Sequence, residues 1–368
     1  MFLLSLASAA TLTGDHLAVG VASDGSLIDS AANLGILHDP DGGGGDPAGT
    51  DLLLPGTQFE TWSLSTSEYT LTNAIPSGTG SEVVWEELVD NGQVQTLRGR
   101  LELPDAAVDL TLDLPSDRTV LYTTFVVTAV EDMDDVRLSR SVDNDVDYGF
   151  NGSYNTTNGA AAGVAWSGSQ LSDKAMALAS PDGVGGVCGW CATPDAILAG
   201  TVGDLDGDYQ IGVASGLGSL AAWDSVEVVF VYAFAATVDE AVLLAEESAA
   251  RKDLDGDGLF EDEGDCDDRD AWAGMVDEVP DGIDNDCDGE IDEDTSISDD
   301  DGDGMSEADG DCDDTDAGVT DCPEAERPAP GVIDDLITEN EAVPGGCGTP
   351  VQAGATWLIG LLVLRRRR

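Results

Sequence analysis

Short runs of alternating hydrophobic and polar residues fill the chain from about residue 15 to residue 236. The stretch VDLTLDL at 108–114 is one example, and a period of two is typical of strands with one buried face. Clusters of Gly, Asp, Asn and Pro separate the runs, notably at 38–49 and 181–186. Many short strands joined by turns favour an antiparallel β-sandwich over alternating strands and helices. The clearest predicted strands are 81–88, 94–103, 108–112, 119–130 and 225–235.

A helix is predicted directly after the last of these strands. Thr237 and Glu240 form the T-x-x-E pattern of a capping box, and alanines and leucines continue the helical pattern to about Arg251. The composition changes abruptly after this point. We therefore expect a mainly β protein in which a β-sandwich domain with a closing helix spans 15–250.

The charge of the chain is strongly negative and unevenly spread. The 368 residues include 74 Asp and Glu against 14 Lys and Arg, a formal net charge of -60. This balance excludes nucleic acid and anionic lipid as attractive partners for most of the surface, and it favours divalent cations. Acids dominate the segment 251–325, where Arg269 is the only base between 253 and 316. Such a composition is typical of a disordered acidic linker, but the spacing of the acids argues against that interpretation.

Three stretches of the acidic segment have the form D-x-D-x-D-G, at 253–258, 284–289 and 299–304. This spacing supplies carboxylates from alternate positions, and the glycine permits the sharp turn that wraps them around one calcium ion. The first and third stretches belong to a longer repeat, since the acids, glycines and cysteine of 253–270 recur at 299–316. Where an EF-hand loop ends in Glu, both copies have Gly, so we expect calcium loops of another kind.

The predicted ligand set consists of oxygen donors, which calcium prefers. Magnesium and manganese are the alternatives, whereas copper is disfavoured because His16 and His38 are the only histidines and lie far from the loops in sequence. The predicted ligands are Asp253, Asp255, Asp257, Glu261, Asp265, Asp267, Asp284, Asp286, Asp288, Asp292, Asp299, Asp301, Asp303, Glu307, Asp311 and Asp313.

Two further acidic triplets occur in the β domain, Asp143-Asp145-Asp147 and Asp204-Asp206-Asp208. Neither has glycine at the sixth position. We therefore expect exposed turn carboxylates here, with a metal site as the less favoured alternative.

The acidic segment resembles a known family. DGDGLFEDEGDCDDRDAW, DGIDNDCDGEIDE and DGDGMSEADGDCDDTDA are similar to the repeated metal-binding motif of MopE-related surface proteins, and in style to thrombospondin type-3 calcium repeats. The resemblance covers 253–325 and implies irregular, disulfide-clipped metal loops. The family is named after a copper-binding protein. Its usual form has a further cysteine where this chain has Pro280, which leaves Cys266 and Cys287 available to each other.

The preferred disulfides of this region are Cys266–Cys287 and Cys312–Cys322, each worth roughly 3 kcal/mol in the chain-entropy model. Sequence does not fix the connectivity, so Cys287–Cys312 remains an alternative.

The N-terminus has the features of an export signal. Apolar residues 2–6 precede the small residues Ala7-Ser8-Ala9, as in a secretory signal peptide over 1–10, although the short start suggests a start codon further upstream. In an exported protein disulfides persist. We therefore interpret Cys188-Gly189-Trp190-Cys191 as a small disulfide clip; a redox-active pair and half of a zinc site are the alternatives.

The C-terminus combines a cysteine, an apolar run and four arginines in GGCGTPVQAGATWLIGLLVLRRRR. A helix over 353–364 is about 18 Å long, well short of the roughly 30 Å hydrocarbon core. After a linker at 326–346, residues 347–368 resemble a MYXO-CTERM sorting tag. The resemblance implies a precursor held in the inner membrane with its arginines inside, cleavage near Cys347, and attachment at the bacterial cell surface or release outside the cell. A plain short tail anchor is the alternative.

Catalytic signatures are weak in this sequence. There is no G-x-S-x-G motif, and a serine triad would depend on His16 or His38. We therefore predict a non-catalytic, calcium-binding surface protein whose sandwich contacts a polysaccharide or protein. The alternative is a carbohydrate-active enzyme, because 206–242 is similar in pattern to the closing strands and helix of sandwich domains in such proteins. Tryptophans at 62, 85, 166 and 190 could stack on sugars or lie in the core. A secreted calcium buffer would leave the strands without a function.

Overall fold

The computed structural model forms two units, residues 1–320 and 321–368, and every residue described below belongs to the first. The predicted linker and sorting tag, with Cys347, lie outside the described residues, as does all but the last residue of the predicted signal peptide. In the described part of the chain, no helix has the length and apolar character needed to cross a membrane. The described residues are 10–39, 51–53, 59–73, 82–145, 154–256, 258–260, 265–269, 271, 273–274, 278–279, 284–287, 290–293, 295–302, 304–306, 308–309, 313 and 316–318.

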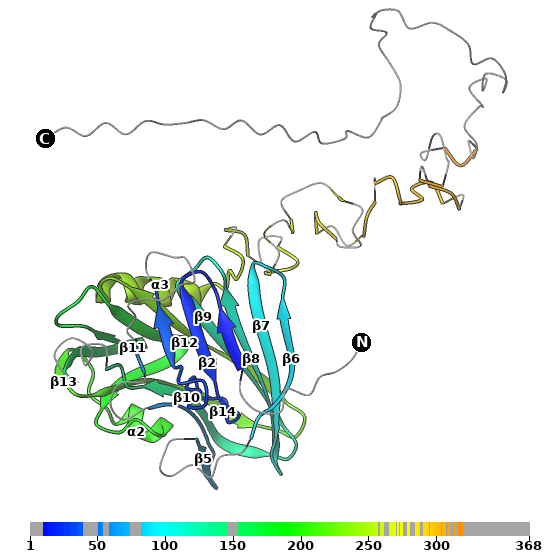
Figure 1. Cartoon of the computed structure of the whole chain (residues 1–368). Helices are drawn as coiled ribbons and strands as arrows, with labels where there is room; N and C mark the ends of the chain where they lie inside the picture. Colours follow the sequence, from blue (N-terminus) through cyan, green and yellow to red (C-terminus); the bar gives the residue numbers. More distant parts are fainter. Residues whose placement is uncertain are drawn as a thin grey trace, which may run out of the picture. The chain divides into compact units, whose positions relative to one another are not determined.

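Antiparallel strands make up most of these residues (Figure 1). A large sheet of twelve strands curls on itself, with the order β5-β4-β10-β14-β12-β15-β9-β8-β7-β6 and with β11 and β13 attached through β12. Its strands are β4 (Glu60–Ser65), β5 (Thr70–Thr72), β6 (Val84–Asp90), β7 (Val94–Glu102), β8 (Ala106–Pro115), β9 (Val120–Ala129), β10 (Met133–Val142), β11 (Thr156–Gly168), β12 (Ala175–Cys188), β13 (Leu205–Gly207), β14 (Gln210–Leu220) and β15 (Ser225–Ala235).

A smaller sheet covers one face of the large one. It consists of β1 (Ala10–Thr13), β2 (Leu17–Val21) and β3 (Ile36–His38), paired in that order. Its apolar side chains share a buried cluster with those of the large sheet. The mainly β, antiparallel prediction is confirmed, and the layers are one large curled sheet and one small sheet.

Period-two alternation explains the two faces of the large sheet. On β15, Phe230 and Tyr232 belong to the core shared with the small sheet, while Val231 and Ala233 belong to a second core. Helix α3 (Val238–Ala250) covers the second face and buries Ala241 and Ala245 there. At β15, both faces of the sheet are thus covered.

The predicted capping box of α3 is present. The Thr237 Oγ1 accepts a hydrogen bond from the Glu240 N–H at 3.3 Å, and the Glu240 side chain accepts one from the Thr237 N–H at 3.2 Å. The second helix, α2 (Pro194–Leu198), begins at Thr193, whose hydroxyl accepts from the Ala196 N–H. These local contacts satisfy N–H groups that a helix leaves without partners.

A buried polar network joins the small sheet to the large one. Arg140 and Glu60 are fully buried and form an ion pair of 2.8 Å. Glu60 also accepts hydrogen bonds from the Tyr232 hydroxyl at 2.6 Å and from the Leu27 N–H at 2.6 Å, while Arg140 donates to the Gly25 carbonyl at 3.1 Å. A buried carboxylate of this fold is thus supplied with a cation, a hydroxyl and a backbone donor, as burial of a charge requires.

The glycine cluster at 181–186 is a strand segment, so its prediction as a turn is wrong. Strand β12 runs through it, pairing with β15 at Ala175–Ala179 and with β14 at Gly183–Cys188. A Cβ added to Gly185 would lie 2.1 Å from the Val164 carbonyl oxygen. Glycine is therefore required by close backbone contact where the strand changes partner and the sheet curls.

The start of the acidic segment is held on the β domain. Leu254 is fully buried in the core beneath α3. Arg269, the only basic residue between 253 and 316, pairs with the buried Asp113 of β8 at 3.2 Å. Lys252 lies 3.7 Å from the same carboxylate. Between 251 and 318, the described residues form turns and bends without helix or strand, consistent with the expected irregular region.

Candidate metal centres

Two groups of three carboxylates stand out in the described residues. Each residue of a group offers one oxygen, and these oxygens all lie within 4.8 Å of one another. Two oxygen ligands of the same calcium ion are at most about 5 Å apart, because each lies 2.3–2.6 Å from the metal. Both groups therefore have the spacing of a shared ion. One group is in the β domain and the other in the acidic segment.

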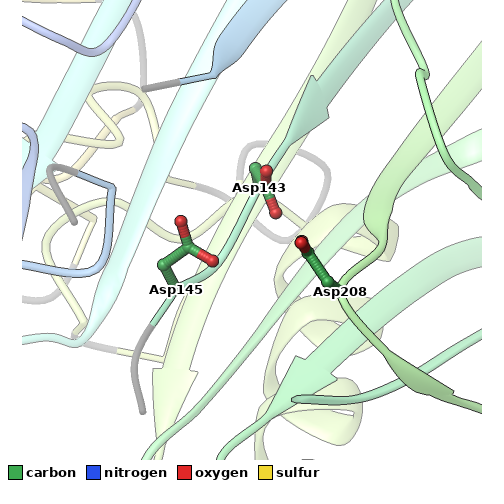
Figure 2. Close-up of side chains that lie close together, drawn as sticks. All are labelled: Asp143, Asp145 and Asp208. Atoms are coloured by element: carbon green, nitrogen blue, oxygen red, sulfur yellow. The ribbon is translucent and has the colours of Figure 1, made fainter. Parts of the chain in front are cut away.

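The β-domain cluster consists of Asp143, Asp145 and Asp208 (Figure 2). Strands β10 and β14 are neighbours with the register Ser141↔Gly212 and Val142↔Ile211. Continuing this register past the end of β10 sets Asp145 opposite Asp208. Asp143 and Asp145 are two positions apart on extended chain, so both side chains lie on one side of it. The segments that directly follow β10 and precede β14 therefore bring the three carboxylates together.

Burial distinguishes this cluster from a surface turn. Asp143 is 8% exposed and Asp145 only 2%, whereas Asp208 is exposed. In the described part of the chain, the Oδ1 atoms of Asp143 and Asp145 are buried and have no hydrogen-bond partner. Figure 2 shows the three carboxylates directed toward a common space. The prediction of exposed turn carboxylates is thus wrong for Asp143 and Asp145, but Asp204 and Asp206 are exposed as expected; Asp147 lies outside the described residues.

The electrostatics of the cluster follow from this burial. Burial, and to a smaller extent the charge of Asp208, raises the pKa of Asp143 to about 7, although a hydrogen bond from Gln210 opposes the shift. Burial, followed by the charges of Asp143 and Asp208, raises the pKa of Asp145 to about 8. Both effects disfavour ionised carboxylates in the absence of a cation. A divalent ion would reverse that preference.

The second cluster is Glu278, Asp284 and Asp286. Glu278 and Asp284 are half-buried and Asp286 is exposed. The Glu278 carboxylate accepts hydrogen bonds from the backbone N–H groups of Asn285 at 2.5 Å, Asp286 at 2.9 Å and Asp292 at 2.8 Å. This one side chain therefore draws the loop around itself and sets the ligand positions.

Both disulfides seen in the described residues match predicted links. Cys266 pairs with Cys287, which immediately follows Asp286, and Cys188 pairs with Cys191. Because Cys287 bonds Cys266, the alternative link from Cys287 to Cys312 is not formed. Cys312 and Cys322 lie outside the described residues.

The remaining predicted ligands fall into two sets. Asp253 pairs with Arg118 at 3.4 Å, and Asp299 accepts from the Gly304 N–H at 2.8 Å. With these two, Asp255, Asp265, Asp267, Asp292, Asp301 and Asp313 are described but belong to neither three-carboxylate group. The predicted ligands that lie outside the described residues are Asp257, Glu261, Asp288, Asp303, Glu307 and Asp311.

Sequence analysis identified Asp284 and Asp286 but missed their partner Glu278, which lies outside the D-x-D-x-D-G pattern and outside the repeat. It also ranked a metal site at Asp143, Asp145 and Asp208 below exposed turn carboxylates. The signal for those three was a pairing of two acidic triplets across neighbouring strands, which becomes visible only when the strand register is known.

Three of the tryptophans considered for sugar stacking differ in their burial. Trp62 and Trp85 are buried and donate their indole N–H groups to backbone carbonyls of Asp24 and Ala22. Trp190 is 41% exposed, and its ring centroid lies 4.8 Å from that of Phe59. Burial of Trp62 and Trp85 excludes them from stacking on a ligand at the surface.

Comparisons with known proteins found only distant structural similarity. No family model matches the chain, and no curated protein matches it. Among solved structures, a bacterial glucoamylase complexed with acarbose matches with a TM-score of 0.43 and 12% identity over 68% of this chain and 36% of that chain. The heparan sulfate lyase HepC from Pedobacter heparinus matches with a TM-score of 0.32 and 5% identity, over 48% of this chain and 24% of the lyase. The Slr1438 protein from Synechocystis sp. PCC 6803 matches with a TM-score of 0.36 and 10% identity, over 64% of this chain and all of that chain. This chain therefore spans about a third of the glucoamylase that it matches.

Proposed function

We propose that this chain is an exported, surface-anchored calcium-binding protein, without catalytic activity, that carries a β-sandwich for a ligand or partner on a calcium-stiffened stalk. The stalk is the acidic segment 251–325. The single observation that carries the proposal is the gathering of Glu278, Asp284 and Asp286 within 4.8 Å in a disulfide-closed loop. Calcium is the preferred ion because every candidate ligand is a hard oxygen.

The loop is arranged for coupling between ion binding and folding. Its three carboxylates repel one another, and a bound cation removes that repulsion. The Cys266–Cys287 disulfide shortens the loop, and the three N–H donors on Glu278 fix its shape. These contacts order part of the loop before the ion binds, so the loop loses less conformational entropy on binding. Calcium then completes a shape that the loop already favours.

The stalk starts from a fixed point on the β domain. Arg269 donates to the fully buried Asp113, and the Asn91 side chain donates to the Arg269 carbonyl at 2.7 Å. The Ala271 N–H also donates to the Gln93 side chain at 2.9 Å. These contacts support a stalk that is continuous with the domain. Surface attachment rests on the resemblance of 347–368 to a MYXO-CTERM tag.

Calcium titration of the full oxidised chain by calorimetry tests the proposal. We expect saturable binding of two or more ions, and we expect the double variant Asp284→Asn/Asp286→Asn to bind at least one ion fewer. Asp309→Asn is the matched control, because Asp309 is an exposed acid of the same segment outside the cluster. Unchanged stoichiometry in the double variant would exclude the Glu278 cluster as a binding site. Turnover of a polysaccharide by the full chain would favour the enzyme alternative instead.

A further inference from the structure

We propose that Asp143, Asp145 and Asp208 form a second calcium site, located inside the β domain, that fastens the end of strand β10 to the turn before strand β14. This site lies outside the acidic segment and therefore goes beyond the proposed function. It also lies outside every D-x-D-x-D-G loop of the sequence.

The first argument is that the scaffold, and not the flexibility of a loop, brings these carboxylates together. Asp143 and Asp145 extend the paired strand β10, and Asp208 lies between β13 and β14. Their oxygens lie within 4.8 Å of one another, and the N–H groups of Asp143 and Asp145 donate to the carbonyls of Phe59 and Leu52 at 2.9 and 3.2 Å. Carboxylates of like charge at this distance are destabilising unless protons or a cation neutralise them. The fold nevertheless enforces the approach.

The second argument is that the cluster contains two buried carboxylate oxygens without a partner. The Oδ1 atoms of Asp143 and Asp145 have no hydrogen-bond partner in the described residues, and both side chains are more than nine-tenths buried. Buried polar atoms are nearly always satisfied, so such atoms point to a missing ligand. Glu60 shows how this fold satisfies a buried carboxylate, with Arg140, Tyr232 and a backbone donor.

The third argument concerns charge and access. No ion pair within the described residues involves a member of the cluster, so no side chain there supplies the positive charge that Arg140 gives to Glu60. Asp208 is exposed, so a hydrated ion can reach it from solvent. Asp143 and Asp145 would then replace part of the ion's water shell from the buried side. Calcium tolerates such a mixed set of carboxylates and waters.

Ion binding at this place would stabilise the neighbouring disulfide loop. The Gln210 side chain hydrogen-bonds Asp143, and its Oε1 accepts from the Cys191 N–H at 2.7 Å. The Asp143 N–H donates to the Phe59 carbonyl at 2.9 Å, and Phe59 supports the exposed Trp190. The calcium site thus adjoins the surface where an aromatic side chain faces solvent.

The test compares Asp145→Asn/Asp208→Asn with Asp204→Asn/Asp206→Asn in the full chain. Both variants replace two carboxyl groups by amides in the same region, but Asp204 and Asp206 are outside the cluster. We expect the cluster variant to bind one ion fewer by calorimetry and the control to bind as many as the natural chain. Calcium at about 100 times the Kd should also raise the Tm of the β domain by about 5–10 °C, and the cluster variant should lose this rise.

The Tm without calcium separates a metal site from a structural acid cluster. Removing two repelling carboxylates should leave the apo Tm unchanged or raise it, whereas loss of a structural hydrogen bond would lower it. A lower apo Tm with an unchanged calcium response would overturn the proposal. Unchanged stoichiometry in a folded cluster variant would overturn it as well. The acidic segment is tested separately by Asp284→Asn/Asp286→Asn, so the two sites can fail independently.

Discussion

Both clusters consist of three carboxylates, but different kinds of structure hold them together. Asp143 and Asp145 are buried directly after strand β10, where the Asp143 N–H donates to the Phe59 carbonyl at 2.9 Å. Glu278 and its partners belong to a loop without regular structure, which a disulfide and backbone hydrogen bonds close. In the first case the fold assembles the carboxylates, and a bound ion would relieve their repulsion. In the second, a bound ion would complete the fold of the loop.

Removing the Cys266–Cys287 disulfide should produce the largest difference between the clusters. A disulfide over a loop of this length contributes about 3 kcal/mol in the chain-entropy model, which corresponds to a factor of about 100 in an equilibrium constant. We expect Cys266→Ser/Cys287→Ser to weaken calcium binding at the loop between about 10-fold and about 100-fold. The β-domain site should keep its affinity.

Calorimetric titration of the natural and variant chains measures this change. Cys188→Ser/Cys191→Ser is the matched control, because it removes a disulfide of the β domain without touching the loop. Equal weakening by both double variants would mean that the effect comes from global destabilisation, and the contrast between the clusters would fail.

The sequence predicted the local features well and the long-range ones poorly. The strand at 225–235 and the capping box at Thr237 follow from period-two alternation and neighbouring residues, and both are present. The approach of Asp145 to Asp208 depends on the register of β10 with β14, which no local pattern encodes. The sequence shows that residue 143 is an aspartate, but the burial of Asp143 depends on residues far along the chain.

Gly185 and Glu278 also have roles that depend on contacts which the local sequence does not encode. A Gly-rich stretch usually marks a turn, yet 181–186 is strand because Gly185 contacts the backbone of a neighbouring strand. Glu278 is one acid among many, and only its three backbone donors distinguish it. Repeats and acid spacing predicted the segment in which the Glu278 cluster lies. They did not identify every member of the cluster.

Detaching the acidic segment from the β domain should have the next largest effect. Asp113 is fully buried and pairs with Arg269 and Lys252, both of which are partly exposed. Water screens these cations, so we expect Asp113→Ala to lower the free energy of unfolding by about 2 kcal/mol, below the range for fully buried pairs. Denaturant unfolding measures this loss. Asp109→Ala, at a half-buried acid of the same strand that pairs with Arg100 at 2.8 Å, is the control.

The same variant tests whether the clusters are independent. Because Asp113 contacts neither cluster, calcium affinity at both should change less than about threefold, within the additivity of separate sites. A larger loss at the loop would show that anchoring to the β domain contributes to its preorganisation.

The pH dependence of the calcium-induced rise in Tm should distinguish the two clusters, with a smaller expected effect. The folded pKa values of Asp143 and Asp145, about 7 and about 8, lie above the usual value of 3.8. Their contribution to the stability of the calcium-free protein is thus complete below about pH 4 and is lost as the pH rises through about 8. Calcium binds the ionised form, so its effect on Tm should be several degrees larger near pH 8.5 than near pH 5.5.

This pH dependence is best measured in Asp284→Asn/Asp286→Asn, where the loop site is absent. Differential scanning calorimetry with and without calcium gives both Tm values at each pH. If the calcium-induced rise does not depend on pH, the buried carboxylates are not the ligands responsible.

The smallest expected effect concerns the role of Glu278 in arranging the loop. Glu278→Gln keeps the size of the side chain and one carbonyl acceptor, but it removes the charge and one of the two acceptor oxygens. Because hydrogen bonds to a charged group are stronger than those to a neutral one, the loop should lose order as well as one anionic ligand. We expect a weakening of calcium binding by about 5- to 20-fold, less than after loss of the disulfide. Glu290→Gln, at an exposed acid of the same loop outside the cluster, should change the affinity less than twofold. If the two glutamine variants weaken binding equally, the loop responds to overall charge, and the geometric role of Glu278 is excluded.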